Sequence, residues 1–339
     1  MTTNESLCLS ISKIIKDYRN NEFGNYDQEH VQRWINQFED HEQEIVLLET
    51  NRILRKNFIT IEKFHEFADT VISYDGVYGK DQKDFWDHVS ILQIQKQGNS
   101  QSELNKIFID KLSKSFNVEG IINARANNYL YIDDFIFTGN RVFTDIRNWL
   151  QSMRPNNCVV HIATIGWYVY GQHNLKTRLD KLVQDASLNI KFVFSTYDNN
   201  IFENRLVRKD YSEIFWPTSE VESDSKIKGY VQENNASPKY RVENGIKNRV
   251  FSRPRREEYE KILLKYGLKI MSFPKNNNSL IKPLGYHRFD LFGFGSTIFN
   301  FRNCPNNNPL VFWWGDPKAP AYHPFSKWYP LLQRDTYKS

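Results

Sequence analysis

The sequence predicts an α/β protein built on an open parallel sheet, with a helical region before the sheet and an aromatic-rich lobe after it. Strand-like and helix-like stretches alternate between Val89 and Phe194, at the spacing of parallel β-α-β units. In addition, the stretch from Cys158 to Ile165 is continuously apolar, as a strand buried on both faces requires. In sheets of this kind, ligands bind at the carboxyl ends of the strands.

Composition narrows the class of protein. With 339 residues and high aromatic content, the chain can build a substantial core, in one large domain or two ordinary ones. The net charge of +5 permits contact with nucleotides or nucleic acid but does not indicate a dedicated binder. Three widely separated cysteines exclude a disulfide framework and a zinc site built mainly of cysteines. Without a membrane-spanning stretch or a secretory N-terminus, we expect a soluble, cytoplasmic protein with no membrane partner.

Residues 1–80 are predicted to form a helical N-terminal region. Apolar residues recur at helical spacing in three successive stretches, for example at Val31, Trp34, Ile35 and Phe38. His30, His41 and His65 are scattered and show no metal-ligand spacing. The region is interpreted as a helical platform, with a partner-docking module as the alternative.

Residues 81–218 are predicted to form the α/β core. Its first unit has a strand at 89–94, a polar turn at 97–102 and a helix from Leu104 to Leu112. The turn is a candidate site for an anionic group, although a plain connection would have the same composition.

The central unit of the core carries the strongest functional signal. An apolar strand ends in Asp133 and Asp134, and the turn Thr138-Gly139-Asn140 leads into a helical pattern at 142–150. Backbone N–H groups of such a turn and the positive end of the helix can hold a phosphate. Two carboxylates at a strand's carboxyl end can hold vicinal sugar hydroxyls or a hydrated metal ion.

The rest of the core follows the same pattern, with a strand at 158–165, a helix around Leu175 to Leu182 and a strand at 190–194. His161 and Cys158 are expected to be buried sheet residues. Residues 219–339 are predicted to form a C-terminal lobe with a mobile loop at about 219–248. The basic run at 253–256 precedes a helix and is interpreted as a solvated face, with phosphate or nucleic-acid contact as the alternative.

The end of the lobe combines a glycine-rich turn at 293–297, a loop at 302–309 and a tryptophan pair at 313–314. These features can close a pocket for a nucleobase or sugar, in which Arg302, Asn303 and Asn306 are the candidate base or acceptor contacts. The alternative is a tightly turned lobe packed by aromatic side chains. Cys304 is interpreted as a buried thiol and not as a nucleophile.

The stretch from Asp133 to Gly139 resembles the ribose-5-phosphate signature of phosphoribosyltransferases. A larger set resembles the phosphoribosyltransferase-like effectors of bacterial conflict systems, some of them encoded with retrons. The resemblance runs from about Val89 to Trp314 and is carried by Asp133-Asp134-Phe135, Thr138-Gly139-Asn140, Glu203-Asn204-Arg205, Trp216-Pro217-Thr218, Pro283-Leu284-Gly285-Tyr286, Phe294-Gly295-Ser296 and Arg302-Asn303-Cys304-Pro305-Asn306-Asn307-Asn308-Pro309.

The resemblance implies a phosphoribosyltransferase-like sheet and a set of residue roles. Asp133 and Asp134 would be the catalytic pair, which binds the ribose hydroxyls and, through the substrate, the Mg²⁺ of a bound diphosphate. The phosphate loop would consist of Thr138, Gly139, Asn140 and Arg141. The diphosphate loop would consist of Gln97, Gly98, Asn99 and Ser100. The chain departs from the signature at Phe137, where a small residue is usual, and at Asn140-Arg141, which replaces a small and hydroxylated pair.

Two functions follow as hypotheses. The first is a toxic anti-phage effector, an enzyme that acts at the anomeric carbon of a ribose phosphate as a glycosyl transferase or an N-glycosidase. Its ligand would be a nucleotide or phosphoribosyl diphosphate, and its cofactor Mg²⁺. The second is a non-catalytic nucleotide-binding or assembly module that docks onto a reverse transcriptase with its non-coding RNA or msDNA. A metabolic phosphoribosyltransferase is disfavoured because the flanking regions exceed what salvage chemistry needs. The sequence leaves the acceptor, the trigger and the oligomeric state open.

Overall fold

The computed structural model describes residues 2–74, 81–96, 100–198, 200–275, 278–286 and 291–334. The chain forms two compact units. Unit 1 comprises residues 1–60 and 203–339, and unit 2 comprises residues 61–202. These limits differ from the domain limits predicted at residues 80 and 218. The reason is that both ends of the chain build unit 1, through the packing of two helices and the pairing of two short strands that are far apart in the sequence.

Unit 2 contains a parallel sheet, which confirms the predicted open α/β fold. Its strand order is β3-β2-β4-β5-β6, and β7 pairs with the end of β5. The strands are β2 (Val89–Ile91), β3 (Ile121–Ile122), β4 (Asn128–Ile136), β5 (Cys158–Tyr168), β6 (Ile190–Thr196) and β7 (Ile201–Phe202). All of these pairs are parallel. The two-residue strands β3 and β7 were not predicted, because so short a segment shows no periodicity.

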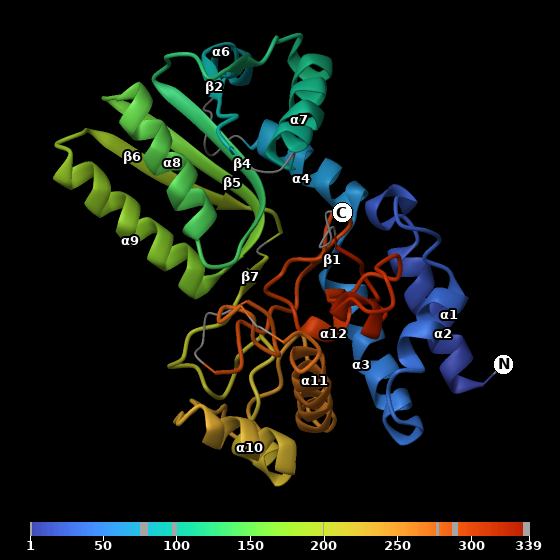
Figure 1. The fold of residues 1–339 in the computed structure, drawn as a ribbon. Coiled ribbons are helices and arrows are strands. Elements are labelled where there is room, and N and C mark those ends of the chain that lie inside the picture. The colour runs from blue at the N-terminus through green and yellow to red at the C-terminus, as the bar shows by residue number, and fades with distance from the viewer. Residues whose placement is uncertain are drawn as a thin grey trace. The chain divides into compact units, whose positions relative to one another are not determined.

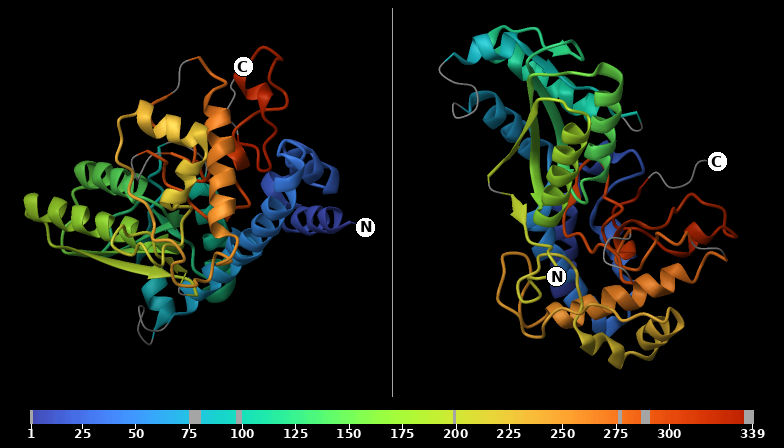
Figure 2. Two further views of the ribbon diagram at one scale, coloured as in Figure 1. Left: turned by 90° about the horizontal axis from the view of Figure 1, so that it is seen from below. Right: turned by 90° about the vertical axis from the view of Figure 1, so that its left-hand side faces the viewer.

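Helices cover both faces of this sheet (Figures 1 and 2). They are α4 (Ile61–Ser73), α6 (Gln82–Asp87), α7 (Ser100–Phe116), α8 (Asn140–Met153) and α9 (Val169–Asp185). Helices α8 and α9 pack on one face over an apolar cluster that includes Tyr131, Ile146, Ile162 and Leu175. Helices α7 and α4 lie on the other face. There α7 contacts β4, and α4 contacts β5. Cys158 and His161 are buried in β5, as predicted.

The strand order places a topological switch point between β2 and β4. The connection after β2 leads to α7 on one face, whereas the connection after β4 leads to α8 on the other. The two connections therefore diverge at the carboxyl ends of these strands. Such a crevice is where open α/β sheets bind ligands.

The regular elements of unit 1 are mostly helices, and α3 and α11 lie side by side in it (Figures 1 and 2). Its elements are α1 (Thr3–Ile15), η1 (Tyr18–Asn21), α2 (Gln28–Ile35), α3 (Asp40–Asn57), β1 (Phe58–Ile59), η2 (Ser219–Ser223), α10 (Ser225–Glu233), α11 (Arg256–Met271), β8 (Phe299–Asn300), α12 (Leu310–Trp313) and η3 (Pro324–Lys327). Strand β1 pairs with β8. The helical start of the chain is confirmed, and Thr2 and Glu5 form a capping box at α1.

The segment predicted to be a mobile loop, 219–248, contains η2 and α10. Asp224 caps α10, because its carboxylate accepts hydrogen bonds from the N–H groups of Lys226 and Ile227. Across the described ranges, no helix is both long enough and apolar enough to cross a membrane.

Candidate functional site

Both predicted catalytic carboxylates lie near the carboxyl end of β4. Asp133 is buried and Asp134 is half-buried. The backbone N–H of Asp134 donates to Asp133 Oδ1 at 2.9 Å, and that of Phe135 donates to Asp134 Oδ1 at 2.7 Å. The pairing of β4 with β5 keeps one register through these residues, from Tyr131 opposite Ile162 to Ile136 opposite Trp167. The acidic pair therefore lies within the paired part of β4, close to its carboxyl end.

A chain of hydrogen bonds connects Asp133 to both sides of the switch point. Gln95, in the connection after β2, donates from Nε2 to Asp133 Oδ2 at 3.3 Å. The Tyr131 hydroxyl lies 3.5 Å from the same oxygen and 3.0 Å from Asp145 Oδ2 on α8. Burial, followed by the charges of the two carboxylates, raises the pKa of Tyr131 well above its usual value, so the hydroxyl remains a donor.

Asp145, the second carboxyl group in this series of hydrogen bonds, also has a shifted pKa. Burial raises its pKa, and the Tyr131 hydrogen bond and the charge of Arg141 oppose that shift. Sequence reasoning missed Gln95, Tyr131 and Asp145. Tyr131 could have been found from the sequence, because it lies two residues before Asp133 and so on the same face of the strand. Gln95 and Asp145 are connected to Asp133 only through the tertiary fold.

The backbone conformation of the predicted phosphate loop requires glycine at position 139. Gly139 adopts a positive φ of 77° and is the N-cap of α8. A Cβ there would lie 2.7 Å from Leu175 Cβ and 2.8 Å from the Gly171 carbonyl oxygen of α9. The Thr138 hydroxyl accepts from the N–H of Asn140 at 3.3 Å. The turn thus ends β4 and begins an amphipathic helix, as predicted, with the positive end of that helix at the loop.

An open hollow of about 430 Å³ lies beside this loop. It is lined by six residues with polar or charged side chains, Lys96, Asn140, Arg141, Thr144, Asp145 and Asn148. Its size is that of a small-ligand site. The predicted phosphate-loop residues Asn140 and Arg141 are therefore brought together with Lys96, which precedes the predicted diphosphate loop.

The predicted diphosphate loop lies at the start of α7 and just before it. Gln97, Gly98 and Asn99 lie outside the described residues, and the backbone of Ser100 begins α7. The assignment of this loop therefore stays a prediction.

The carboxylates suit Mg²⁺ only as part of a complex with a ligand. Mg²⁺ prefers oxygen ligands in octahedral geometry and is usually held by one or two carboxylates together with substrate phosphates. Asp133 and Asp134 supply such oxygens, but within the described ranges they belong to no group of three possible metal ligands. Such a group does exist at Glu39, His41 and Glu42, where Lys265 Nζ lies 2.9 Å from both glutamates and holds them as ion pairs.

The predicted base or acceptor residues belong to unit 1. Arg302, Asn303 and Asn306 are half-buried in a loop whose backbone joins the other motifs of that unit. The Asn306 carbonyl accepts from the N–H of Tyr286 at 2.9 Å, and the Asn307 carbonyl accepts from that of Ser296 at 2.9 Å. This arrangement supports the alternative of a tightly packed lobe. The role of the three residues as base or acceptor contacts stays a prediction.

Cys304, in the same loop, is a buried thiol, as predicted. Burial raises its pKa far above the usual value, so it does not form the thiolate that a nucleophile needs.

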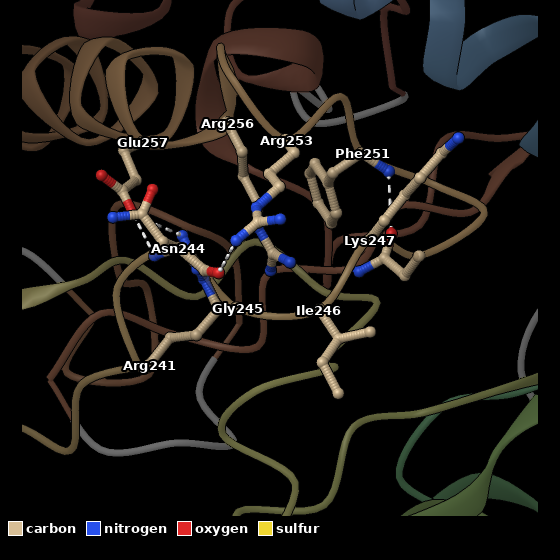
Figure 3. A pocket seen from close by; sticks show the side chains of 10 residues that line it. Arg241, Asn244, Gly245, Ile246, Lys247, Phe251, Arg253, Arg256 and Glu257 are labelled. Atoms are coloured by element: carbon tan, nitrogen blue, oxygen red, sulfur yellow. Dashed lines mark hydrogen bonds and ion pairs between the residues drawn. The ribbon is translucent and has the colours of Figure 1, made fainter.

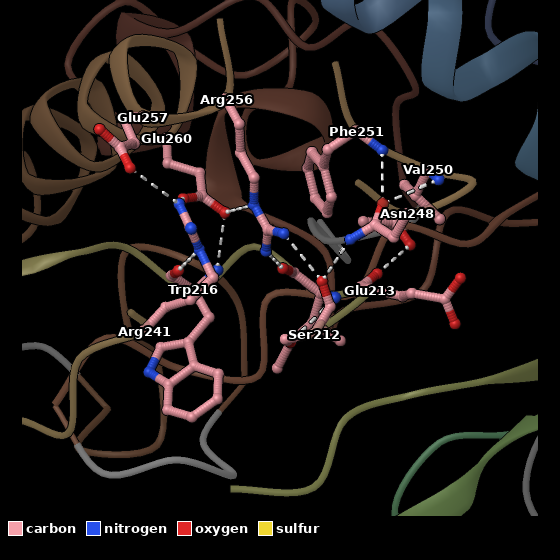
Figure 4. Close-up of polar contacts among 12 residues, drawn as sticks. Ser212, Glu213, Trp216, Arg241, Asn248, Val250, Phe251, Arg256, Glu257 and Glu260 are labelled. Atoms are coloured by element: carbon pink, nitrogen blue, oxygen red, sulfur yellow. Dashed lines mark hydrogen bonds and ion pairs between the residues drawn. The ribbon is translucent and has the colours of Figure 1, made fainter. Parts of the chain in front are cut away.

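One arginine of the basic run, Arg256, has a structural role (Figure 4). Arg256 is buried, which contradicts the predicted solvated face at this position, whereas Arg253 and Arg255 are exposed. The Arg256 guanidinium donates to Glu260 at 2.9 Å and to the carbonyls of Ser212 and Ile214 at 2.8 Å.

Arg241 completes this buried group by donating to the second Glu260 oxygen at 3.0 Å. Arg241, Arg253 and Arg256 line a pocket of about 20 Å³ (Figure 3). That volume admits a water molecule but not a phosphate, so this pocket gives no support to the phosphate-contact alternative.

The fold and the site together define a phosphoribosyltransferase-like α/β protein. Its parallel sheet carries an acidic pair followed by a glycine turn and a helix, at the switch point of the strand order. The PRTase-CE family model matches residues 31–334, so the chain belongs to the PRTase-CE family of phosphoribosyltransferase-like effectors. A comparison with curated proteins finds no match.

Proposed function

We propose that this protein is a toxic effector of a bacterial anti-phage system, of the retron type, and acts at the anomeric carbon of a ribose phosphate or nucleotide. One observation carries the proposal. At the switch point, a carboxylate pair at the end of β4, with Asp133 buried and Asp134 half-buried, is followed by a glycine turn. Tyr131 links Asp133 to Asp145, which lines an open hollow together with the basic residues Lys96 and Arg141. A ribose phosphate needs these elements, with hydroxyl acceptors on one side and phosphate donors on the other.

The residues divide the chemistry between them. Departure of diphosphate or a base from the anomeric carbon leaves positive charge on the sugar ring, which a nearby carboxylate stabilises. Asp133 is suited to this task because Gln95 and the backbone N–H of Asp134 hold its carboxylate in place. Arg141, Lys96 and the start of α8 supply positive charge for the phosphates. When bound with a diphosphate, Mg²⁺ would neutralise the leaving group, held indirectly by Asp133 and Asp134.

The test is release of product from labelled phosphoribosyl diphosphate, and from a panel of nucleotides, by purified protein with Mg²⁺. Changing Asp133→Asn together with Asp134→Asn is expected to lower turnover about a hundredfold or more and to abolish toxicity in cells. Asp110→Asn, an exposed change on α7, is the matched control and should leave both unchanged. Equal turnover and toxicity in the wild type and the double variant would falsify the catalytic proposal.

A non-catalytic nucleotide-binding or assembly module is the second candidate. The departures at Phe137, Asn140 and Arg141 favour it, since ligand binding tolerates them better than transfer chemistry does. Its partner would be a reverse transcriptase bound to non-coding RNA or msDNA, docked on the helical N-terminus.

The docking test must keep unit 1 folded. Trp34 of α2 is buried and donates to the Val311 carbonyl at 2.9 Å, so deleting the first helices would disrupt the unit. Lys13→Glu and Lys16→Glu change exposed charges on and just after α1 instead. Loss of partner co-purification in these variants, with the enzyme assay silent in the wild type, would support the second candidate.

A further inference from the structure

Backbone groups in the connection after β2 are hydrogen-bonded by a side chain and not by a neighbouring strand. The ladder between β2 and β4 ends after Leu92, whose N–H donates to the Leu130 carbonyl at 2.8 Å. Beyond this point the chain leaves β4 toward α7, and the backbone groups on both sides lose their strand partners. Buried backbone groups need replacements, because an unpaired one costs about as much as a lost hydrogen bond.

One side chain supplies the replacements on both sides. Gln101, in the first turn of α7, is buried to 1% exposure. Its Oε1 accepts from the N–H groups of Ile94 and Gln95 at 2.8 and 3.0 Å. Its Nε2 donates to the Ile132 carbonyl of β4 at 3.4 Å. A single amide therefore continues the ladder at the place where the two strands separate.

The two ends of this bridge lie directly beside the candidate site. Gln95 donates to Asp133, and Ile132 is the residue before Asp133. We propose that Gln101 is a positioning residue that fixes the connection after β2 against the end of β4, and so sets the geometry in which Asp133 and Lys96 meet one phosphorylated ligand. The ligand-binding part of this proposal rests on the proposed function, whereas the structural bridge does not.

Neighbouring amides provide a matched comparison. Asn105, on the same helix, donates to the Leu92 carbonyl at 3.1 Å, and Asn123 pairs with both backbone groups of Gln93 at 2.8 and 3.0 Å. These contacts hold the same connection but make no bond to β4. Only a bridging role predicts that Gln101 matters more to the ligand than Asn123 does.

The first experiment is hydrogen exchange at individual amides in the full chain. Gln101→Leu should speed exchange at Ile94 and Gln95 about tenfold or more, while amides within α8 keep their wild-type rates. Gln101→Glu keeps the acceptor and should preserve protection at both amides. Wild-type exchange rates at Ile94 and Gln95 in Gln101→Leu would overturn the bridge.

The second experiment measures binding of phosphoribosyl diphosphate with Mg²⁺ by calorimetry. Gln101→Leu and Gln101→Glu should each weaken binding about tenfold or more, because both lose the bond to Ile132. Asn123→Ala should stay within about twofold. Equal losses in Asn123→Ala and Gln101→Glu, or wild-type affinity in Gln101→Glu, would overturn the positioning role. If the wild type binds no such ligand, the proposed function fails while hydrogen exchange still decides the bridge.

Discussion

Basic side chains serve opposite purposes in the two units. In unit 1, Arg241 and Arg256 are buried on either side of Glu260 and line a pocket with room for only a water molecule. In unit 2, Arg141 and Lys96 line a hollow some twenty times larger, with the glycine turn and carboxylates beside it. The comparison teaches that a cluster of arginines in the sequence does not mark a ligand site. What matters is whether the fold surrounds the guanidinium groups with carboxylates and carbonyls or with open space.

The sharpest test of this contrast is Glu260→Gln. Removing the only fully buried carboxylate of the group leaves two buried guanidinium groups without their shared counter-charge. We expect the free energy of unfolding to fall by about 3–5 kcal/mol, measured by denaturant titration. Glu257→Gln is the control, because Glu257 is partly exposed and 3.9 Å from Arg241, and it should cost about 1 kcal/mol or less. Equal losses in the two variants would show that burial does not determine how much each glutamate contributes to the free energy of unfolding.

A second test uses His161, a histidine that is buried within β5 of the sheet in unit 2. Burial, followed by the charge of Lys191, lowers the pKa of His161 in unit 2 from 6.5 to about 4. Between these values the unfolded chain binds more protons than the folded one, so stability rises with pH across this window and is fully present above it. The change amounts to about 3 kcal/mol. His161→Phe should flatten the pH dependence of unfolding between about pH 4 and 6.5, and an unchanged slope would contradict the assignment.

Substitution of Gly139 in the glycine turn should have an intermediate effect on the free energy of unfolding. Gly139→Ala places a Cβ at positive φ and against Leu175 and Gly171, which should cost about 1–2 kcal/mol and weaken ligand binding by misplacing the loop. Gly229→Ala is the matched control, since nothing lies within 4 Å of its Cβ inside α10, and it should stabilise that helix by up to about 1 kcal/mol. Thermal unfolding and calorimetric titration would distinguish the two variants.

The smallest effect on folding is expected at the hollow itself. Arg141 is exposed, so Arg141→Gln should change unfolding by less than about 0.5 kcal/mol while weakening phosphate binding about tenfold. Lys114→Gln makes the same charge change on an exposed position of α7 and should leave binding unchanged. If both variants bind alike, the hollow is not the phosphate site.

The parts of the structure that sequence reasoning predicted share a local cause. The long strands β4 and β5 carry apolar runs, and the acidic pair and glycine turn are contiguous, so pattern alone locates them. The two-residue strands β1 and β8 have no such pattern, and their pairing joins Phe58 to Phe299 across most of the chain. Gln101 lay within the predicted turn at 97–102, but its contacts, like those of Gln95 and Asp145, escaped prediction for the same reason. Gln101 binds backbone groups at the point where β2 leaves β4, whereas Gln95 and Asp145 bind side chains of β4. Each of these contacts joins segments that no local pattern brings together.

The construction of unit 1 from both ends of the chain has a consequence for synthesis. Strand β1 and helix α3 emerge early from the ribosome, but β8 and α11, against which they pair and pack, emerge only after all of unit 2. Because domains generally fold as units during translation, the site-bearing sheet can form while the first sixty residues still wait for their partners. A nascent or prematurely terminated chain would thus carry the acidic pair and glycine turn in a finished sheet before the second part of unit 1, residues 203–339, has been synthesised.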